Sequence, residues 1–322
     1  MRKKNCYLGI DTSNYMTSIC FINEEHEIIY EAKKLLEVKM GEKGLQQSQA
    51  TFQHIKNLPM LFKQVNEMEE YQLSGIAVSK GPRPEEGSYM PVFLAGMAVA
   101  ESMAKVLNIP LIFTTHQEGH IAAGIHSADQ KMTSNHFLAV HLSGGTSEVL
   151  EVRNIGTAFE IDIIGGTLDL HAGQLIDRIG VLLGFPFPAG PSIEKLAKIS
   201  NDDFKRIPTS IKELCFHFSG AEAEAKRRLA KNEPRESIAR AIEHHIAASI
   251  TKVLSKALEK EYPKDILIVG GVAQNQYIRN YLIKQLEHPR LGGRLFFAHK
   301  NYSGDNAFGV ATIGLTQILL NK

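Results

Sequence analysis

The order of strands and helices expected from the sequence repeats once along the chain. The first half opens with an apolar strand at about 5–10, the small polar turn Asp11-Thr12-Ser13 and two further strands. The second half opens with a strand at about 137–142, the turn Ser143-Gly144-Gly145-Thr146-Ser147 and again two strands. Helices and strands then alternate in both halves. Such a duplication predicts a two-lobed α/β protein that holds its ligand in the cleft between the lobes.

The size and composition agree with a two-lobed protein. The chain has 322 residues, which is long for one hydrophobic core, and 43% of them are apolar. The formal net charge is +1, so a nucleic-acid partner would need a local basic patch. Three scattered cysteines argue against a disulfide framework. No apolar stretch reaches the roughly 18 residues of a membrane span, so we expect a cytoplasmic protein without a membrane partner.

The polar stretch 126–135 is the expected junction between the lobes. A closing helix from about Gly304 to Leu320 is expected to pack back on the first lobe. We therefore expect a first lobe of residues 1–130 plus about 298–322, and a second lobe of residues 131–297 with a helical insertion at about 185–262.

Two histidines, His116 and His120, follow the strand expected at 109–113. Residues i and i+4 lie on the same helix face, and two imidazoles so placed can bind one metal ion. Asp305, at the start of the closing helix, could supply an oxygen ligand and complete a His₂Asp site, or could cap the helix. The spacing alone also leaves open an ordinary structural histidine pair.

Turns of glycine and hydroxyl residues at strand ends suit a phosphate, because glycines let backbone N–H groups approach it and hydroxyls add donors. Asp11 and Ser13 in one turn, and residues 143–147 in the other, are therefore expected to face one cleft. In the segment 270–275, Gly270 and Gly271 would admit an adenine or ribose that Asn275 could bind. A tight turn with Asn275 as a helix cap is the alternative.

Two aspartates, Asp169 and Asp177, are eight residues apart, or about two helical turns. This spacing would place both on one face of a helix expected at about 169–184, on the cleft side of the second lobe. Capping of a helix explains Asp169 equally well.

With these motifs in view, the chain resembles the family of TsaD, the tRNA threonylcarbamoyladenosine transferase subunit once labelled a glycoprotease. The resemblance runs nearly end to end, through Gly9-Ile10-Asp11-Thr12-Ser13, Gly81-Pro82, His116-x-x-x-His120, Ser143-Gly144-Gly145, Asp177, Phe185-Pro186-Phe187-Pro188-Ala189-Gly190-Pro191, Phe216-His217-Phe218-Ser219-Gly220, Gly270-Gly271-Val272-Ala273-Gln274-Asn275 and Asp305-Asn306.

The resemblance implies an actin/Hsp70-like ATPase fold of duplicated ribonuclease H-like domains. It implies one divalent metal, Fe²⁺ or Zn²⁺, held by His116, His120 and Asp305. It also implies tRNA as the acceptor, with a TsaB-like paralogous subunit and a P-loop ATPase as partners. The implied contacts to an adenine nucleotide (threonylcarbamoyl-AMP, AMP or ATP) come from Leu142, Ser143, Gly144, Gly145, Thr146, Asp177, Gly190, Glu194 and Asn275.

Several polar positions depart from the family's pattern. The family's Cys-Asp-Glu run is here Asn14-Tyr15-Met16, and its Ser-Gly-Gly-His-Thr lacks the histidine in the segment 143–147. Its Asp-Asp-Ala-Ala-Gly-Glu becomes Asp169-Leu170-His171-Ala172-Gly173-Gln174, and the loop 81–88 is longer than usual. His141 and His171 are new near these turns, and we expect them to be satisfied buried side chains. We interpret the chain as a diverged paralogue.

Three functions fit these observations. The leading one transfers a threonylcarbamoyl group from threonylcarbamoyl-AMP to N6 of an adenosine in tRNA, and aligned reactants need no dedicated nucleophile. The lost carboxylates favour a nucleotide- and metal-binding scaffold or regulator, and a carbamoyltransferase for a small acceptor fits the same lobes. Six basic residues predict either a tRNA-facing stripe or a solvated helix face: Lys212, Lys226, Arg227, Arg228, Lys231 and Arg235.

Overall fold

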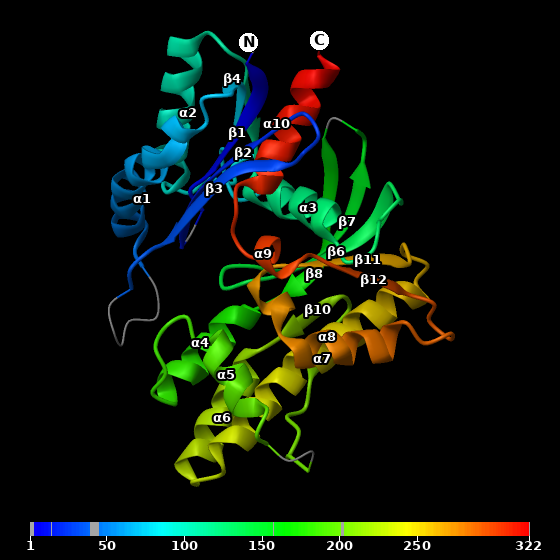
Figure 1. The fold of residues 1–322 in the computed structure, drawn as a ribbon. Helices are drawn as coiled ribbons and strands as arrows, with labels where there is room; N and C mark the ends of the chain where they lie inside the picture. The colour runs from blue at the N-terminus through cyan, green and yellow to red at the C-terminus, as the bar shows by residue number, and fades with distance from the viewer. Residues whose placement is uncertain (1–2, 14, 39–44, 157, 201–202, 322) are drawn as a thin grey trace.

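The computed structural model describes residues 3–13, 15–38, 45–156, 158–200 and 203–321, and it contains two sheets, one in each lobe (Figure 1). The first sheet has the order β3-β2-β1-β4-β5, and the second has the order β12-β11-β6-β7-β8-β10-β9. The segment from β8 back to β12 repeats the order of the first sheet. The expected duplication is thus confirmed, with the β9–β10 hairpin added at one edge of the second sheet.

The two sheets also share their strand directions. β1, β2 and β3 are antiparallel neighbours, as are β6, β7 and β8, whereas β1-β4-β5 and β6-β11-β12 are parallel. The strands are β1 (Lys4–Asp11), β2 (Met16–Ile22), β3 (Ile28–Leu35), β4 (Tyr71–Ser79), β5 (Leu111–Thr114), β6 (His136–Leu142), β7 (Ser147–Asn154), β8 (Phe159–Thr167), β9 (Ser210–Lys212), β10 (Cys215–His217), β11 (Asp265–Val269) and β12 (Arg294–Phe297).

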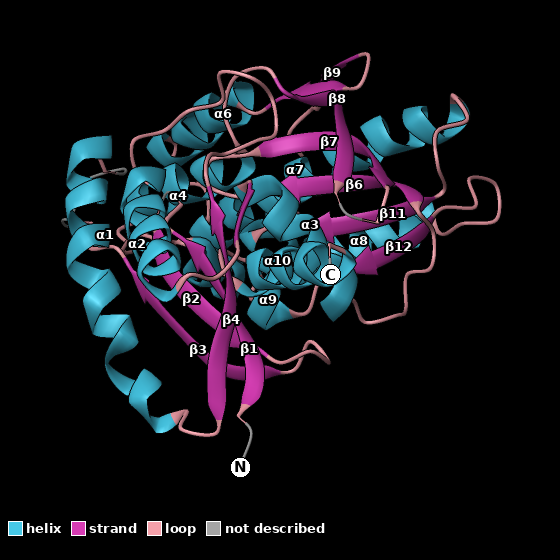
Figure 2. Ribbon diagram, turned by 90° about the horizontal axis from the view of Figure 1, so that it is seen from above, coloured by secondary structure: helices cyan, strands magenta, loops and turns pink. Residues whose placement is uncertain are grey.

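Helices cover both faces of each sheet, and two of them lie between the lobes (Figure 2). α1 (Gln47–Leu61), followed by η1 (Phe62–Glu67), and α2 (Phe93–Leu107) cover the outer face of the first sheet, while α10 (Phe308–Leu320) crosses its inner face. α3 (His116–Ser127) packs on α10 and on β11 of the second sheet. The remaining helices are α4 (Ala172–Leu182), α5 (Gly190–Ala197), α6 (Ser219–Ala230), α7 (Arg235–Glu259), η2 (Gly271–Gln274), α8 (Gln276–Leu286) and α9 (Lys300–Ser303).

The core follows from this layering. β1 and β2 are almost wholly buried because helices cover both of their faces, and the two strand cysteines, Cys6 and Cys20, are 2% and 0% exposed. On the second sheet, side chains of β6 pack alternately against α3 on one face and against α4 and α7 on the other. Among the described residues, no helix combines the length and the apolar character that crossing a bilayer requires.

We propose a first lobe of residues 1–130 plus about 298–322 and a second lobe of residues 131–297, because α10 returns to the first sheet.

The closing helix starts later than the sequence predicts. It begins at Phe308 rather than near Gly304, and Ala307 is its cap residue. Asn306 causes this: its Oδ1 accepts the Phe308 N–H at 3.0 Å, while its Nδ2 donates to the Gly304 carbonyl at 2.7 Å. The prediction that Asp305 begins this helix is therefore wrong, and its carboxylate is left for another purpose.

Glycine at position 309 allows α10 to touch α3 through the backbone. A Cβ atom built on Gly309 would lie 1.9 Å from the Gly119 carbonyl oxygen and 2.7 Å from the Ala123 amide nitrogen. The start of α10 meets the first sheet just as closely, because a Cβ on Gly9 would lie 2.4 Å from the Ala307 carbonyl oxygen. The segment that carries Asp305 is therefore held against both β1 and α3.

We expect Gly309→Ala to destabilise the protein by about 1–3 kcal/mol, because the added methyl group must push α10 away from α3. Urea unfolding measures the change. Gly220→Ala is the matched control, since Gly220 lies in α6 and its Cβ would meet nothing within 4 Å. That variant should be neutral or slightly more stable. Equal stability of the Gly309 variant and the wild type would show that the helix crossing can relax.

Candidate metal and nucleotide site

The histidine pair lies on α3, and hydrogen bonds stabilise the start of this helix. Thr115 and Glu118 form a capping box, in which the Thr115 hydroxyl accepts the Glu118 N–H and the Glu118 carboxylate accepts the Thr115 N–H at 2.9 Å. The N–H groups of His116 and Gln117 donate to the carbonyls of Gly81 and Pro82 at 3.0 Å. The helix therefore begins where the sequence predicts, and the loop 81–88 is tied to it.

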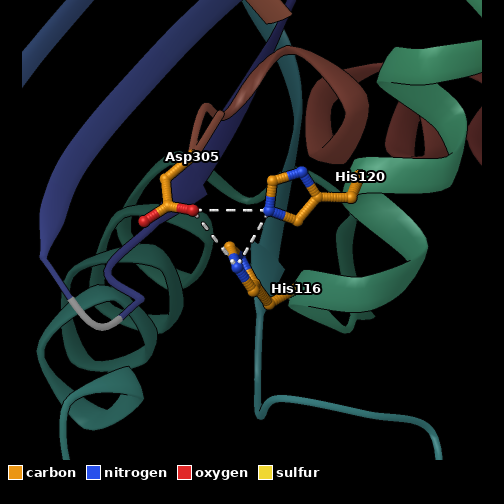
Figure 3. A group of neighbouring side chains, drawn as sticks. All are labelled: His116, His120 and Asp305. Atoms are coloured by element: carbon orange, nitrogen blue, oxygen red, sulfur yellow. Dashed lines mark hydrogen bonds and ion pairs between the residues drawn. The ribbon is translucent and has the colours of Figure 1, made fainter. Parts of the chain in front are cut away.

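His116, His120 and Asp305 point toward one another, as predicted (Figure 3). The two Nε2 atoms are 3.1 Å apart, and Asp305 Oδ1 lies 3.6 Å from His116 Nε2 and 3.4 Å from His120 Nε2. Ligand atoms at about 2.0–2.1 Å from a tetrahedral ion lie about 3.3 Å apart, so the donor set fits a divalent metal in both chemistry and spacing. The alternative of a structural histidine pair would have Asp305 as its ion-pair partner, so the metal itself stays a prediction.

Asp11 lies behind His116 rather than on the surface of the cleft. It is fully buried, and its carboxylate accepts the hydroxyls of Ser13 and Ser79 at 2.5 Å and faces His116 Nδ1 at 3.3 Å. Burial alone would raise the pKa of Asp11, but His116 and the two hydroxyls outweigh it and lower the pKa to about 2. Asp11 thus orients the His116 ring, as carboxylates behind metal-binding histidines commonly do.

The pKa of His116 depends on the same contact with Asp11. Burial lowers its pKa, but the carboxylates of Asp11 and Asp305 outweigh burial and raise the pKa to about 9. His120 is shifted the other way, because burial and the charge of His116 lower its pKa. His116 therefore lies between two carboxylates, and their negative charge favours a cation at this position.

A cavity of about 480 Å³ opens beside this group. Its floor is the turn after β6, with Ser143, Gly144, Gly145 and Thr146, and Ser13 faces it from the first lobe. His116 and Asp305 also line it, so the structure brings the predicted phosphate turn and the metal group to one cavity. Leu142 is buried beneath the turn, at the end of β6.

The turn at 270–275 lies against the phosphate turn. A Cβ on Gly270, which has φ +98°, would lie 2.2 Å from the Leu142 carbonyl oxygen. Asn275 caps α8 by accepting the Ile278 N–H at 3.0 Å, and its Nδ2 donates to buried Glu243 at 2.6 Å. The capping alternative is thus present in the structure, and the adenine contact of Asn275 stays a prediction.

One other predicted nucleotide position, Glu194, lies next to the turn at 270–275. Glu194 Oε1 accepts the Gln276 N–H at 3.3 Å, which brings α5 beside the start of α8. A Cβ on Gly144, Gly190 or Gly271 would meet nothing within 4 Å. Of these three glycines, Gly144 lines the main cavity, and the contacts of all three with a nucleotide stay predictions.

A smaller cavity of about 60 Å³ adjoins the first one and contains Asp177 and two of the substituted positions, Tyr15 and Gln174. Asp177 Oδ1 accepts the Ala189 N–H at 2.7 Å, and burial raises the pKa of this carboxyl to about 6. The rings of Tyr15 and Phe187 meet at 5.3 Å across the lobes. Asn14, the first substituted position, lies outside the described residues.

Several sequence expectations about polar side chains need correction. Asp169 precedes α4 rather than lying on it, and accepts the N–H groups of Phe218 at 2.8 Å and Ser219 at 3.2 Å, so it does not share a helix face with Asp177. His141 is buried but not satisfied, because neither of its ring nitrogens has a hydrogen-bond partner in the part of the chain that the structure describes. His171 Nδ1 is unpaired in the same sense.

The basic run is not a free cationic stripe. Arg228 is 3% exposed and donates to Glu224 at 2.8 Å, while Lys226 pairs with Glu222 at 2.5 Å. Arg227 also pairs with Glu224, at 2.8 Å. The helix-face alternative describes this part of α6 better than a tRNA-facing stripe does.

Sequence reasoning missed an ion pair at the edge of the cleft. Arg83, in the long loop after β4, pairs with Glu148 on β7, and Gln117 Nε2 donates to the other Glu148 oxygen at 2.8 Å. No spacing rule connects residues so far apart in the chain. The loop's unusual length was the one available signal.

Comparison of the sequence with known proteins identifies the family to which the chain belongs. A family model described as "TsaD: tRNA N6-adenosine threonylcarbamoyltransferase" matches residues 29–312. The chain belongs to the TsaD family. Two curated relatives with the name tRNA N6-adenosine threonylcarbamoyltransferase extend the likeness to nearly the full chain. The Thermosipho melanesiensis protein is 28% identical and covers 95% of this chain and 93% of its own length. The Carboxydothermus hydrogenoformans protein is 27% identical and covers 98% and 93%.

Solved structures show the fold of this TsaD-family chain. HypF from T. kodakarensis is similar with a TM-score of 0.64 at 12% identity, over 99% of this chain and 48% of HypF. The activator of the 2-hydroxyisocaproyl-CoA dehydratase from Clostridium difficile, solved with bound ADPNP, has a TM-score of 0.55 at 15% identity, over 98% and 96% of the two chains. The chain therefore has the two-lobed α/β architecture that its duplication predicts and the actin/Hsp70-like ATPase fold that the resemblance implies.

We expect one divalent metal ion per chain, and His116→Ala should lose it because two ligands remain from a set of three. Elemental analysis of purified protein measures the content. His126→Ala is the matched control, since His126 lies on the same helix but lines a different cavity. It should keep the metal. Equal metal content in the wild type and the His116 variant would show that His116 does not bind the metal and would contradict the proposed site.

Proposed function

We propose that this TsaD-family chain transfers a threonylcarbamoyl group from threonylcarbamoyl-AMP to N6 of an adenosine in tRNA. The observation that supports the proposal is the shared cavity, which residues 143–146 line together with His116 and Asp305 of the candidate metal group. The cavity lies between the lobes, so both reactants can reach it. We further propose that the protein acts in the cytoplasm with a TsaB-like paralogous subunit and a P-loop ATPase.

In this reaction the adenine N6 forms a bond to the carbamoyl carbon and gives up a proton to water, while the bond from that carbon to the phosphate oxygen breaks and AMP leaves with its electron pair. The turn of residues 143–146 binds the phosphate through its free backbone N–H groups and its hydroxyls, while the Ser13 hydroxyl stays bonded to Asp11. His116, His120 and Asp305 hold the metal, Fe²⁺ or Zn²⁺, which when bound supplies Lewis-acid chemistry beside the cavity.

The adenosine part of the substrate occupies the second lobe in this proposal. We assign its contacts to Gly190, Glu194, Gly271 and Asn275; Glu194 accepts the Gln276 N–H beside Asn275, and Asp177 lines the small cavity that adjoins the main one. Because transfer between aligned reactants needs no covalent intermediate, the main contribution of these residues is position. Asp11 contributes indirectly, by fixing the His116 ring.

We expect AMP to stabilise the protein by about 2.7 kcal/mol at 100 times its dissociation constant, as any ligand specific for the folded state does. Calorimetric melting with and without AMP measures this. Gly144→Val should fold normally but lose the shift, because its side chain would occupy open space at the phosphate turn. Gly220→Val, equally open but outside the cleft, should keep the shift. No shift for the wild type at saturating AMP would contradict a nucleotide site.

We expect tRNA modification by this chain alone to be slow, because Tyr15 and Gln174 line the cleft where the family has carboxylates. Loss of one preorganised polar contact costs about 2.7–4 kcal/mol of transition-state stabilisation. The assay supplies threonylcarbamoyl-AMP and tRNA, with and without the two partners, and compares the wild type with Gln174→Glu, which should be faster. Full-speed transfer by the chain alone would show that the lost carboxylates are dispensable. No transfer with both partners present would favour a nucleotide-binding scaffold.

A further inference from the structure

The main cavity contains one strongly basic side chain. Among the described residues that line it, Arg83 is the one arginine or lysine. The phosphate turn and the metal group account for one anionic group of the proposed substrate, namely its phosphate. The same substrate carries a second anion, the carboxylate of its amino-acid part, and neither of those features is assigned to it. An arginine is the side chain best suited to a carboxylate, because its planar fork matches the two oxygens.

Arg83 is held in place from both lobes. Its Nη2 pairs with Glu148 on β7, and Gln117 on α3 fixes Glu148 from the other side at 2.8 Å. Its own backbone N–H donates to the Ser88 hydroxyl at 3.2 Å, and the preceding Pro82 carbonyl accepts the Gln117 N–H at 3.0 Å. The guanidinium is therefore oriented before any ligand arrives.

The guanidinium also keeps donors for a ligand. One third of the Arg83 side chain is exposed, at 33%, against 9% for Glu148. Its Nε and Nη1 atoms have no hydrogen-bond partner among the residues that the structure describes. Met90 and Phe93 line the same cavity and offer an apolar surface beside this cation.

We propose that Arg83 binds the amino-acid carboxylate of the acyl group and so selects threonylcarbamoyl-AMP over adenylates that lack a carboxylate. This inference rests on the proposed function and adds a specificity residue to it. Arg83 touches the substrate away from the bond that breaks, so its effect is on recognition. Glu148 and Gln117 are positioning residues, since they act through Arg83.

The test is calorimetric binding of three ligands: AMP, a non-hydrolysable analogue of threonylcarbamoyl-AMP, and the same analogue with its carboxylate changed to a carboxamide. Arg83→Gln should weaken binding of the acid analogue by about 10- to 100-fold, the range expected for a hydrogen-bonded charge. It should change binding of AMP and the carboxamide by less than about 2-fold, since neither presents a carboxylate to this side chain. Arg83→Lys should keep part of the preference, because lysine lacks the fork.

Two further variants separate recognition from disturbance of the fold. Arg83→Gln combined with Glu148→Gln leaves no buried carboxylate unpaired and should show the same loss of preference. Arg153→Gln is the control, because Arg153 is an exposed arginine on β7 that pairs with Glu151 and lies outside the cavity. It should bind all three ligands like the wild type.

The outcomes distinguish this inference from the proposed function. If the double variant still prefers the acid analogue over the carboxamide, Arg83 does not read the carboxylate. If the wild type binds AMP but shows no such preference, the Arg83 assignment fails while the nucleotide site stands. If the wild type binds none of the three ligands, the proposed nucleotide site fails and the Arg83 assignment fails with it.

Discussion

The backbone contact between α3 and α10 supports the rest of the structure. α3 packs on the second sheet through Ile121 and Gly124, and α10 packs on the first sheet, so their crossing joins the lobes. Glycine at 309 makes this crossing possible, because any side chain there would meet the Gly119 carbonyl. The crossing also sets the distance between the histidines of α3 and Asp305, which lies just before α10. A metal group made from two distant parts of the chain thus depends on one close approach of two helices.

The two equivalent turns of the duplicated halves, after β1 and after β6, have different roles. In the second half, the turn after β6 lines the main cavity, and Gly144 leaves room there for a ligand. In the first half, Asp11 in the equivalent turn is fully buried and is occupied by Ser13, Ser79 and His116. A buried carboxylate is stable only where donors or charges compensate it. The first turn therefore supports the metal group, while the second is free to bind phosphate.

Much of this arrangement follows from local sequence rules. Apolar runs predict most of the strands, and the i, i+4 spacing of His116 and His120 predicts the helix and its histidine pair. Local rules fail where a side chain's partner is distant in sequence. Asp11 could not be assigned to His116, 105 residues away, and Arg83 could not be paired with Glu148, 65 residues away. The three-residue strands β9 and β10 were also missed, because so short a segment shows no period.

The position of the metal group has a mechanical consequence. All three of its side chains belong to the helix pair between the lobes or to the turn that enters it. Rotation of one lobe about this pair would change the distance between Ser13 and the turn after β6, which lie on opposite sides of the cleft. It would change the distances within the metal group far less, as points near a hinge move least. A bound ion could then stay in place through successive openings of the cleft, while the spent nucleotide escapes and a fresh one enters.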